Sequence, residues 1–137
     1  MTANGSIWWN ELHTSDDQGA ISFYTQLVGW RIFQLSGMDS LKPATESEPV
    51  YTVWMMGWSQ AGGMMKLSPE LSAKIPPSWM PFIAVGDVDA CADKAVALGG
   101  EIVAAPFDVA NSGRFAILRD PQGALFGIGR PGDINPA

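Results

Sequence analysis

Hydrophobic and polar positions form two similar series along the chain, and the first begins near the N-terminus. Residues 7–13 alternate between the two kinds, which is typical of a half-buried strand. A helix is predicted over 16–29, where Asp16 supplies a start signal, apolar residues recur at helical spacing and Gly29 supplies a stop. Three β-rich segments follow this helix at 30–35, 50–56 and 64–67.

The second series repeats this order in the C-terminal half. A strand over 82–85 and a helix over 87–100 are predicted, and the later strands fall at 102–106, 115–118 and 124–128. Both series therefore run strand, helix, strand, strand, strand. Neither half, at roughly 60 residues, buries much apolar area alone, so we expect the halves to pack on each other or on a partner chain.

Proline marks the boundary between the two series. Pro69, Pro76 and Pro77 remove backbone donors and restrict the residues before them, so 69–78 is predicted to be a linker. The chain is accordingly interpreted as a single domain of two modules, residues 6–68 and 79–131.

Composition narrows the class of protein. The 137 residues are 47% hydrophobic and carry a net charge of −6, with no cluster of basic residues and no long apolar run. Nucleic acid and anionic membranes are therefore unexpected partners, and a cytoplasmic globular protein is predicted. The only cysteine, Cys91, lies between two alanines, so a packed helical residue is expected rather than a reactive thiol.

Four segments carry a resemblance to a known family. They are "ELHTSDDQGAISFYTQLVGW", "GGMMKL", "IAVGDVDACADKAVALGGEIV" and "GRFAILRDPQGALFGI". Together they resemble the vicinal oxygen chelate superfamily, which includes glyoxalase I, extradiol dioxygenases and bleomycin-resistance proteins. The resemblance implies an α+β fold of two βαβββ modules, each with its sheet curled into a half-cup that faces any active site.

The resemblance also implies where metal ligands would lie, on the first and last strand of each module. In this chain those positions fall on Trp9, Lys66 (or Met64 if the register slips by two), Met80 and Gly127. Divalent metals require carboxylate, imidazole or thiolate donors. None of these residues offers one, so no metal or other cofactor is predicted.

Glu11 and the only histidine, His13, are the candidate catalytic residues. Strand alternation places them on one side with Trp9, and the family register turns that side toward the cup. Two strand positions separate them by roughly 6–7 Å, too far for a direct hydrogen bond unless the side chains lean together. His13 can transfer a proton or contact a ligand, and the alternative is a satisfied structural group.

Aromatic and methionine side chains are candidates for the wall of a ligand pocket. Trp8 and Trp30 are expected to pack between sheet and helix instead. The candidates are Trp9, Trp54, Trp79, Met64, Met80 and Phe82, with Lys66 at the wall as well. Such a wall suits a flat or aromatic ligand, and the alternative is that these side chains only fill the cup.

Arg114 and the Gly62–Gly63 pair are two further candidate features of a site. Arg114 begins a strand, where its guanidinium can clamp a carboxylate or phosphate at the pocket mouth or form a surface ion pair. Gly62 and Gly63 are too short a run for a phosphate loop, and they predict a turn before a strand.

These features favour a protein that binds a small organic molecule without metal, as the resemblance implies for bleomycin-resistance members. The first alternative is a lyase or isomerase of the glyoxalase type, in which Glu11 or His13 transfers a proton. A metal-dependent dioxygenase follows if the register is wrong, and a module that serves interaction only is also open. A homodimer is expected from the resemblance and from the sheet edges that two half-cups leave without partners.

Overall fold

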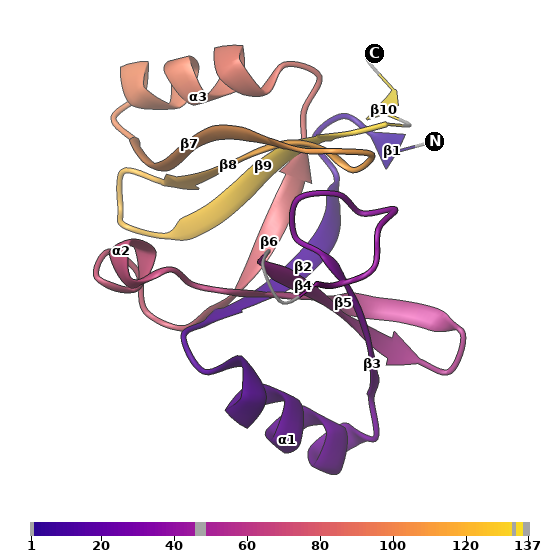
Figure 1. Cartoon of the computed structure of the whole chain (residues 1–137). Coiled ribbons are helices and arrows are strands. Elements are labelled where there is room, and N and C mark those ends of the chain that lie inside the picture. The colour runs from indigo at the N-terminus through magenta and orange to yellow at the C-terminus, as the bar shows by residue number, and fades with distance from the viewer. Residues whose placement is uncertain (1, 46–48, 133, 136–137) are drawn as a thin grey trace. The chain divides into compact units, whose positions relative to one another are not determined.

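The structure, a computed structural model, describes residues 2–45, 49–132 and 134–135. Its first βαβββ module consists of β2 (Ile7–Thr14), α1 (Asp17–Val28), β3 (Arg31–Ser36), β4 (Val50–Met56) and β5 (Ser59–Lys66). The second consists of β6 (Ser78–Ala84), α3 (Val88–Ala97), β7 (Glu101–Val109), β8 (Gly113–Arg119) and β9 (Leu125–Pro131). The predicted α+β class with two βαβββ modules and curled sheets is confirmed (Figure 1).

Both modules have the same strand order. The first runs β3-β4-β5-β2 and the second β7-β8-β9-β6, so the first and last strand of each module are parallel neighbours. By their contacts, the residues divide into two compact units, 10–79 and 1–9 with 80–137, and the first three residues of β2 therefore belong to the second unit. Two short strands, β1 (Thr2–Ala3) and β10 (Ile134–Asn135), pair in parallel within that unit.

The predicted linker contains one turn of helix, α2 (Pro69–Ser72). Ser68 is its N-cap and accepts a hydrogen bond from the Leu71 amide, and a proline at the first helical turn costs no hydrogen bond. Prolines in this segment therefore start a short helix as well as separating the modules. The module boundaries 6–68 and 79–131 stay a prediction.

Both long helices begin where the sequence predicts and α1 also ends there, whereas α3 ends at Ala97, before the predicted Gly99 and Gly100. The Asp16 side chain accepts from the Gly19 amide at 2.9 Å, and Gly29 ends α1 in the left-handed conformation at φ 74°. The Asp87 side chain likewise accepts from the Ala90 amide at 3.0 Å. Capping residues thus fix the helix ends independently of packing.

Replacing Asp87 by alanine is expected to lower the free energy of unfolding by about 0.5–2 kcal/mol, because the first turn of α3 loses its cap. Urea unfolding followed by circular dichroism measures the change. Asp93→Ala, an exposed change within the same helix, is the matched control and should leave the midpoint nearly unchanged. Equal losses in the two variants would contradict a capping role.

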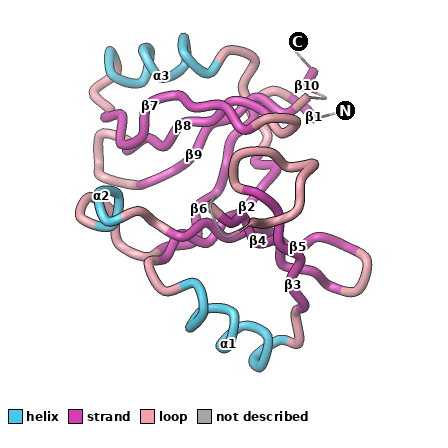
Figure 2. The backbone as a smooth tube through the Cα atoms, in the orientation of Figure 1, coloured by secondary structure: helices cyan, strands magenta, loops and turns pink. Residues whose placement is uncertain are grey.

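Each helix covers one face of its module's sheet (Figures 1 and 2). In the second module Val88 and Ala92 of α3 pack on Ala116, Leu118 and Ile128. The strand residues in this list follow the two-residue period of a strand. The opposite side of each sheet, called here the helix-free face, carries the candidate chemistry.

In the first module the covered face holds Leu12, Trp54 and Met64. Ile21, Tyr24 and Trp30 pack against them, which confirms the predicted place of Trp30. The predicted apolar face of α1 is only half used, because Leu27 and Val28 are exposed at 62% and 54%. Helical spacing identified the apolar face of α1, but it could not show how much of that face the sheet covers.

Candidate functional site

Glu11 and His13 lie on the helix-free face of the first module. Register pairs Glu11 with Gly63 and His13 with Met65, and Met65 in turn pairs with Tyr51. Paired residues of neighbouring strands share a face, so these five residues lie on the side away from α1. Strand alternation also assigns Trp9, which is half-buried, to the side of Glu11.

The Glu11 carboxylate joins two other side chains in a buried network. Glu11 Oε2 lies 2.5 Å from His13 Nε2, and the Tyr51 hydroxyl donates to Glu11 Oε1 at 2.6 Å. His13 is 0% exposed and Glu11 7%. The two side chains lean together along the strand, which is the condition under which the predicted separation of roughly 6–7 Å allowed a direct hydrogen bond.

The contact between Glu11 and His13 requires one proton between the two side chains. A carboxylate that is ionised only accepts hydrogen bonds, so in that form of Glu11 the donor is Nε2 of His13. Charge-assisted bonds of this kind are short and strong, and they hold an imidazole in one orientation. The arrangement is that of a base and the carboxylate that orients it.

Tyr51 was not identified from the sequence, and its position depends on a glycine. A Cβ added at Gly63 would overlap the Tyr51 hydroxyl oxygen and lie 2.5 Å from its Cζ. Gly62 and Gly63 are therefore interior residues of β5, and the predicted turn was wrong. Glycine occurs there because a ring lies close to the backbone, a reason that the local sequence does not reveal.

Three predicted wall residues lie on the other side of this sheet. Trp54 and Met64 are buried in the core beneath α1. The indole of Trp79 contacts the rings of Tyr24 and Trp30, and its Nε1 donates to the Tyr24 hydroxyl at 3.0 Å. Their assignment to a pocket on the helix-free face was wrong, because strand register, which decides the face, was not known.

Lys66, another predicted wall residue, also lies off the helix-free face. It is exposed and pairs with Thr14, one position beyond His13 and Met65. The residue of β5 beside His13 is Met65, so the assigned register was off by one. A shift of one residue moves a side chain to the opposite face.

Aromatic rings cover the helix-free face of the second module. Trp8 stacks on Phe115 with ring centroids 6.5 Å apart and meets Phe82 edge-on at 6.2 Å. Trp8 therefore packs on rings of the second module, on the side of that sheet away from α3, which corrects its predicted place between sheet and helix. Met80 follows the same alternation as Phe82 and is 1% exposed.

Glycines on β9 make room for these rings. A Cβ at Gly129 would lie 2.6 Å from the Phe115 ring and 2.7 Å from the Trp8 ring. A Cβ at Gly127 would overlap the Phe82 ring, whose Cζ would lie 2.7 Å away. The ring of Phe82 thus occupies the space into which any larger side chain at position 127 would project.

Arg114 forms a surface ion pair, which is one of the two roles predicted for it. Its guanidinium donates to both carboxylate oxygens of Asp89, at 2.7 and 2.9 Å, and to Asp108 at 3.1 Å. These hydrogen bonds raise the pKa of Arg114, and the bond to Asp89 has the largest effect. The same bond lowers the pKa of Asp89. The guanidinium is therefore already occupied by carboxylates of its own module.

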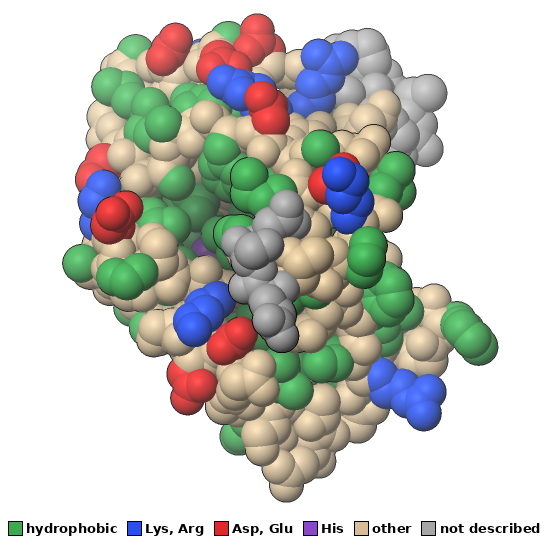
Figure 3. Space-filling view, in the orientation of Figure 1, with side chains coloured by type: hydrophobic (Ala, Val, Ile, Leu, Met, Phe, Trp, Pro, Cys, Tyr) green, Lys and Arg blue, Asp and Glu red, His purple; other side chains and the backbone are tan. Residues whose placement is uncertain are grey.

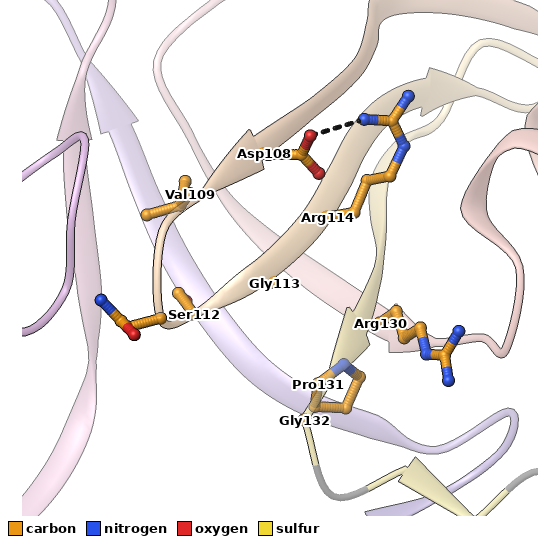
Figure 4. Close-up of a pocket in the computed structure, with 9 residues that line it drawn as sticks. Asp108, Val109, Ser112, Gly113, Arg114, Arg130, Pro131 and Gly132 are labelled. Atoms are coloured by element: carbon orange, nitrogen blue, oxygen red, sulfur yellow. Dashed lines mark hydrogen bonds and ion pairs between the residues drawn. The ribbon is translucent and has the colours of Figure 1, made fainter.

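An open surface depression of about 490 Å³ lies beside this ion pair (Figure 4). The β7–β8 turn and the end of β9 line it, and Arg130 points away from the pair formed by Arg114 and Asp108. Neither Glu11 nor His13 borders it. Cys91 packs on the covered face of the same module, as the sequence predicted, and burial raises its pKa.

The metal site that the resemblance implies does not fit these residues. The positions where the resemblance implies metal ligands hold Trp9, Met65, Met80 and Gly127, and the Phe82 ring lies over Gly127. None of these residues supplies a carboxylate, imidazole or thiolate to a metal ion. Within residues 2–45, 49–132 and 134–135, no three His, Cys, Asp or Glu side chains gather as a metal-binding group. In the same residues no helix is both long and apolar enough to cross a membrane.

Comparison with known proteins places the chain in a family. The family model for the Glyoxalase/Bleomycin resistance protein/Dioxygenase superfamily matches residues 8–128, nearly the whole chain. The chain belongs to this superfamily. As a member, it is 38% identical over 131 residues to "Putative glyoxylase CFP32" of Mycobacterium tuberculosis, a match that covers 96% of the chain and 46% of that protein.

Another relative comes from antibiotic biosynthesis. The chain is 28% identical over 150 residues to "Anthracycline biosynthesis protein DnrV" of Streptomyces peucetius, with 98% of the chain and 50% of the relative covered. The chain spans about half the length of the curated relatives it matches. Their activities as whole proteins therefore do not transfer directly to this superfamily member.

Solved structures support the fold. Streptomyces coelicolor methylmalonyl-CoA epimerase in complex with 2-nitronate-propionyl-CoA superposes with a TM-score of 0.58 at 16% identity, covering 94% of this chain and 99% of that one. The hypothetical protein BH1468 of Bacillus halodurans gives the same TM-score at 13% identity. At these identities the likeness concerns the fold alone.

Proposed function

We propose that this superfamily member binds a small organic molecule at the helix-free face of its first module, with the Glu11–His13 pair as the polar contact. The single observation that carries this proposal is the buried Tyr51–Glu11–His13 network. Buried charged groups are costly and are seldom retained without a partner or a purpose. A few converging polar groups among apolar side chains are typical of ligand sites.

The ligand class that we propose is a flat, largely aromatic molecule. The helix-free face of the second module, taken by itself, also carries rings that can contact a flat ligand, those of Trp8 and Phe115. Aromatic rings bind other rings through stacked or edge-on contacts. The relative's name, anthracycline biosynthesis protein, is consistent with the same class.

A thermal-shift screen tests this proposal. A panel of anthraquinones, other polycyclic aromatics and CoA thioesters is added to the whole chain, and the melting temperature is recorded. A molecule at 100 times its dissociation constant should add about 2.7 kcal/mol of stability. His13→Ala should weaken the shift, whereas Lys66→Ala, an exposed change on the opposite face, should not. A panel without any shift would contradict the proposal.

The contact between Glu11 and His13 favours a second function, a lyase or isomerase that moves a proton within its substrate. A positioned acid or base contributes about 10² to 10⁴ to a rate. Proton exchange of bound panel members in D2O, followed by NMR, tests it. Exchange that persists in His13→Ala would exclude His13 as the proton-transfer group.

We further propose that this function does not use a divalent metal. The argument rests on Met65, Met80 and Gly127, none of which supplies a metal-binding atom of the required kind. Metal content by mass spectrometry, after incubation with zinc, nickel, manganese and ferrous iron, tests this point. Stoichiometric metal that resists dialysis would overturn it and favour a metal-dependent dioxygenase.

A homodimer in the cytoplasm remains our proposal for the assembly and location. The edge strand β3 exposes Phe33 at 58%, and Trp58 at the tip of the β4–β5 hairpin is fully exposed, where Figure 3 shows hydrophobic side chains. Exposed hydrophobic edges favour association. Light scattering at micromolar concentration should give twice the mass of the chain, and a monomer would contradict the proposal.

A further inference from the structure

We infer that Tyr51 is a positioning residue, which holds the Glu11 carboxylate so that Glu11 in turn fixes the imidazole of His13 for proton transfer. The inference rests on the proposed function and assigns an order to its residues. His13 is the proton-transfer group, Glu11 orients it, and Tyr51 orients Glu11. The sequence left open whether Glu11 or His13 transfers the proton.

The geometry around Glu11 carries this order. One carboxylate oxygen accepts from the Tyr51 hydroxyl at 2.6 Å and the other contacts His13 Nε2 at 2.5 Å. Because both oxygens are engaged, the carboxylate cannot rotate toward a substrate without breaking one of these bonds. Glu11 is 7% exposed, so neither broken bond is readily replaced by water. A group held in this way orients its neighbour better than it accepts a proton.

Tyr51 reaches Glu11 across a whole strand. It belongs to β4 and Glu11 to β2, and β5 lies between them in the sheet. The phenol crosses β5 at Gly63, where a Cβ would overlap its hydroxyl oxygen. Strand β5 thus has a gap in its row of side chains at the residue that pairs with Glu11. A glycine at this place is what allows the hydrogen bond to form.

The proton transfer that this order supports needs no other reactant. Because His13 is 0% exposed, a bound molecule reaches it only when a side chain that covers it moves aside. His13 then takes a proton from an acidic C–H or O–H of that molecule, and the bond electrons stay on the substrate. The resulting imidazolium faces the Glu11 carboxylate, which offsets its charge. Return of the same proton to a neighbouring atom of the substrate completes an isomerisation. Tyr51 keeps its own proton throughout.

The single histidine makes the inference directly testable by NMR. The imidazole of His13 gives one pair of ¹⁵N signals, and their separation reports how completely one tautomer is held. Spectra are recorded well above the ordinary imidazole pKa of about 6.5, where the ring of a model histidine is neutral. In the unaltered chain we expect two well-separated signals, with the proton on Nε2.

Tyr51→Phe removes only the hydroxyl and is expected to bring the two signals closer together, because Glu11 is then free to turn. Gly63→Ala should have the same effect by displacing the phenol. The control is Tyr24→Phe, since the chain has two tyrosines and the Tyr24 hydroxyl bonds to Trp79 on the covered side. That variant should leave the His13 signals unchanged.

The outcomes separate this inference from the function on which it rests. Unchanged His13 signals in a folded Tyr51→Phe variant would overturn the inference, because a packing role alone lowers the melting temperature without altering the tautomer. If Gly63→Ala does not fold, Tyr51→Phe alone decides. Altered signals with no shift anywhere in the ligand panel would support the positioning role and contradict the proposed function.

Discussion

Phe82→Ala is expected to lower the free energy of unfolding by roughly 3–5 kcal/mol, one of the two largest effects that the structure predicts. The ring is 4% exposed and is bounded by Trp8, Phe115 and Gly127, so its removal leaves a cavity that these neighbours cannot fill. Chemical unfolding followed by tryptophan fluorescence measures the loss, and an unchanged slope shows that compactness is preserved.

The same contact predicts the reverse experiment. Gly127→Ala adds a methyl group that overlaps the Phe82 ring and should cost about 1–3 kcal/mol. Combined with Phe82→Ala, the added methyl enters the cavity, so the double variant should lose less than the sum of the single losses. Gly86→Ala is the control, because a Cβ there meets nothing within 4 Å. Strictly additive losses in the free energy of unfolding would mean that the Phe82 ring and a side chain at position 127 do not compete for the same space.

The helices were the most predictable part of the fold. Asp16 and Gly29 bound α1, and Asp87 starts α3, because capping depends on residues within one turn of the helix end. Strand β4 likewise has its predicted bounds, whereas β5 begins five residues earlier than predicted. The prediction for β5 was wrong because its two glycines leave room for Tyr51 and for a neighbouring strand and do not form a turn.

The candidate site was predicted in part. Alternation along β2 placed Glu11 and His13 together, since this requires only the period of one strand. The faces of Trp54, Met64 and Lys66 depend on the pairing of different strands, and a register error of one residue reverses them. Tyr51, 40 residues from Glu11, joins the site only through that pairing. Contacts within one element were accessible to sequence reasoning, and contacts between elements were not.

Glu11→Ala should also cost roughly 3–5 kcal/mol, for an electrostatic reason rather than a packing one. The substitution leaves the buried imidazole of His13 and the hydroxyl of Tyr51 without their shared acceptor. The loss of a buried partner costs more than the bond itself contributes, because the remaining polar groups stay desolvated. Urea unfolding of the single variants Glu11→Ala and His13→Ala and of the double variant measures the coupling.

An exposed ion pair supplies the control for this cycle. Arg119 and Glu101 lie 2.8 Å apart with Glu101 largely exposed, so Glu101→Ala should change the stability by about 1 kcal/mol or less. We expect the double variant of Glu11 and His13 to be more stable than the sum of its single losses implies, because it removes both groups that burial penalises. If Glu11→Ala lowers the free energy of unfolding no more than Glu101→Ala does, the Tyr51–Glu11–His13 network is solvated, which would contradict a buried ligand site there. A large loss with strong coupling would mean that this sheet retains, at considerable energetic cost, a carboxylate and an imidazole whose arrangement suits proton transfer.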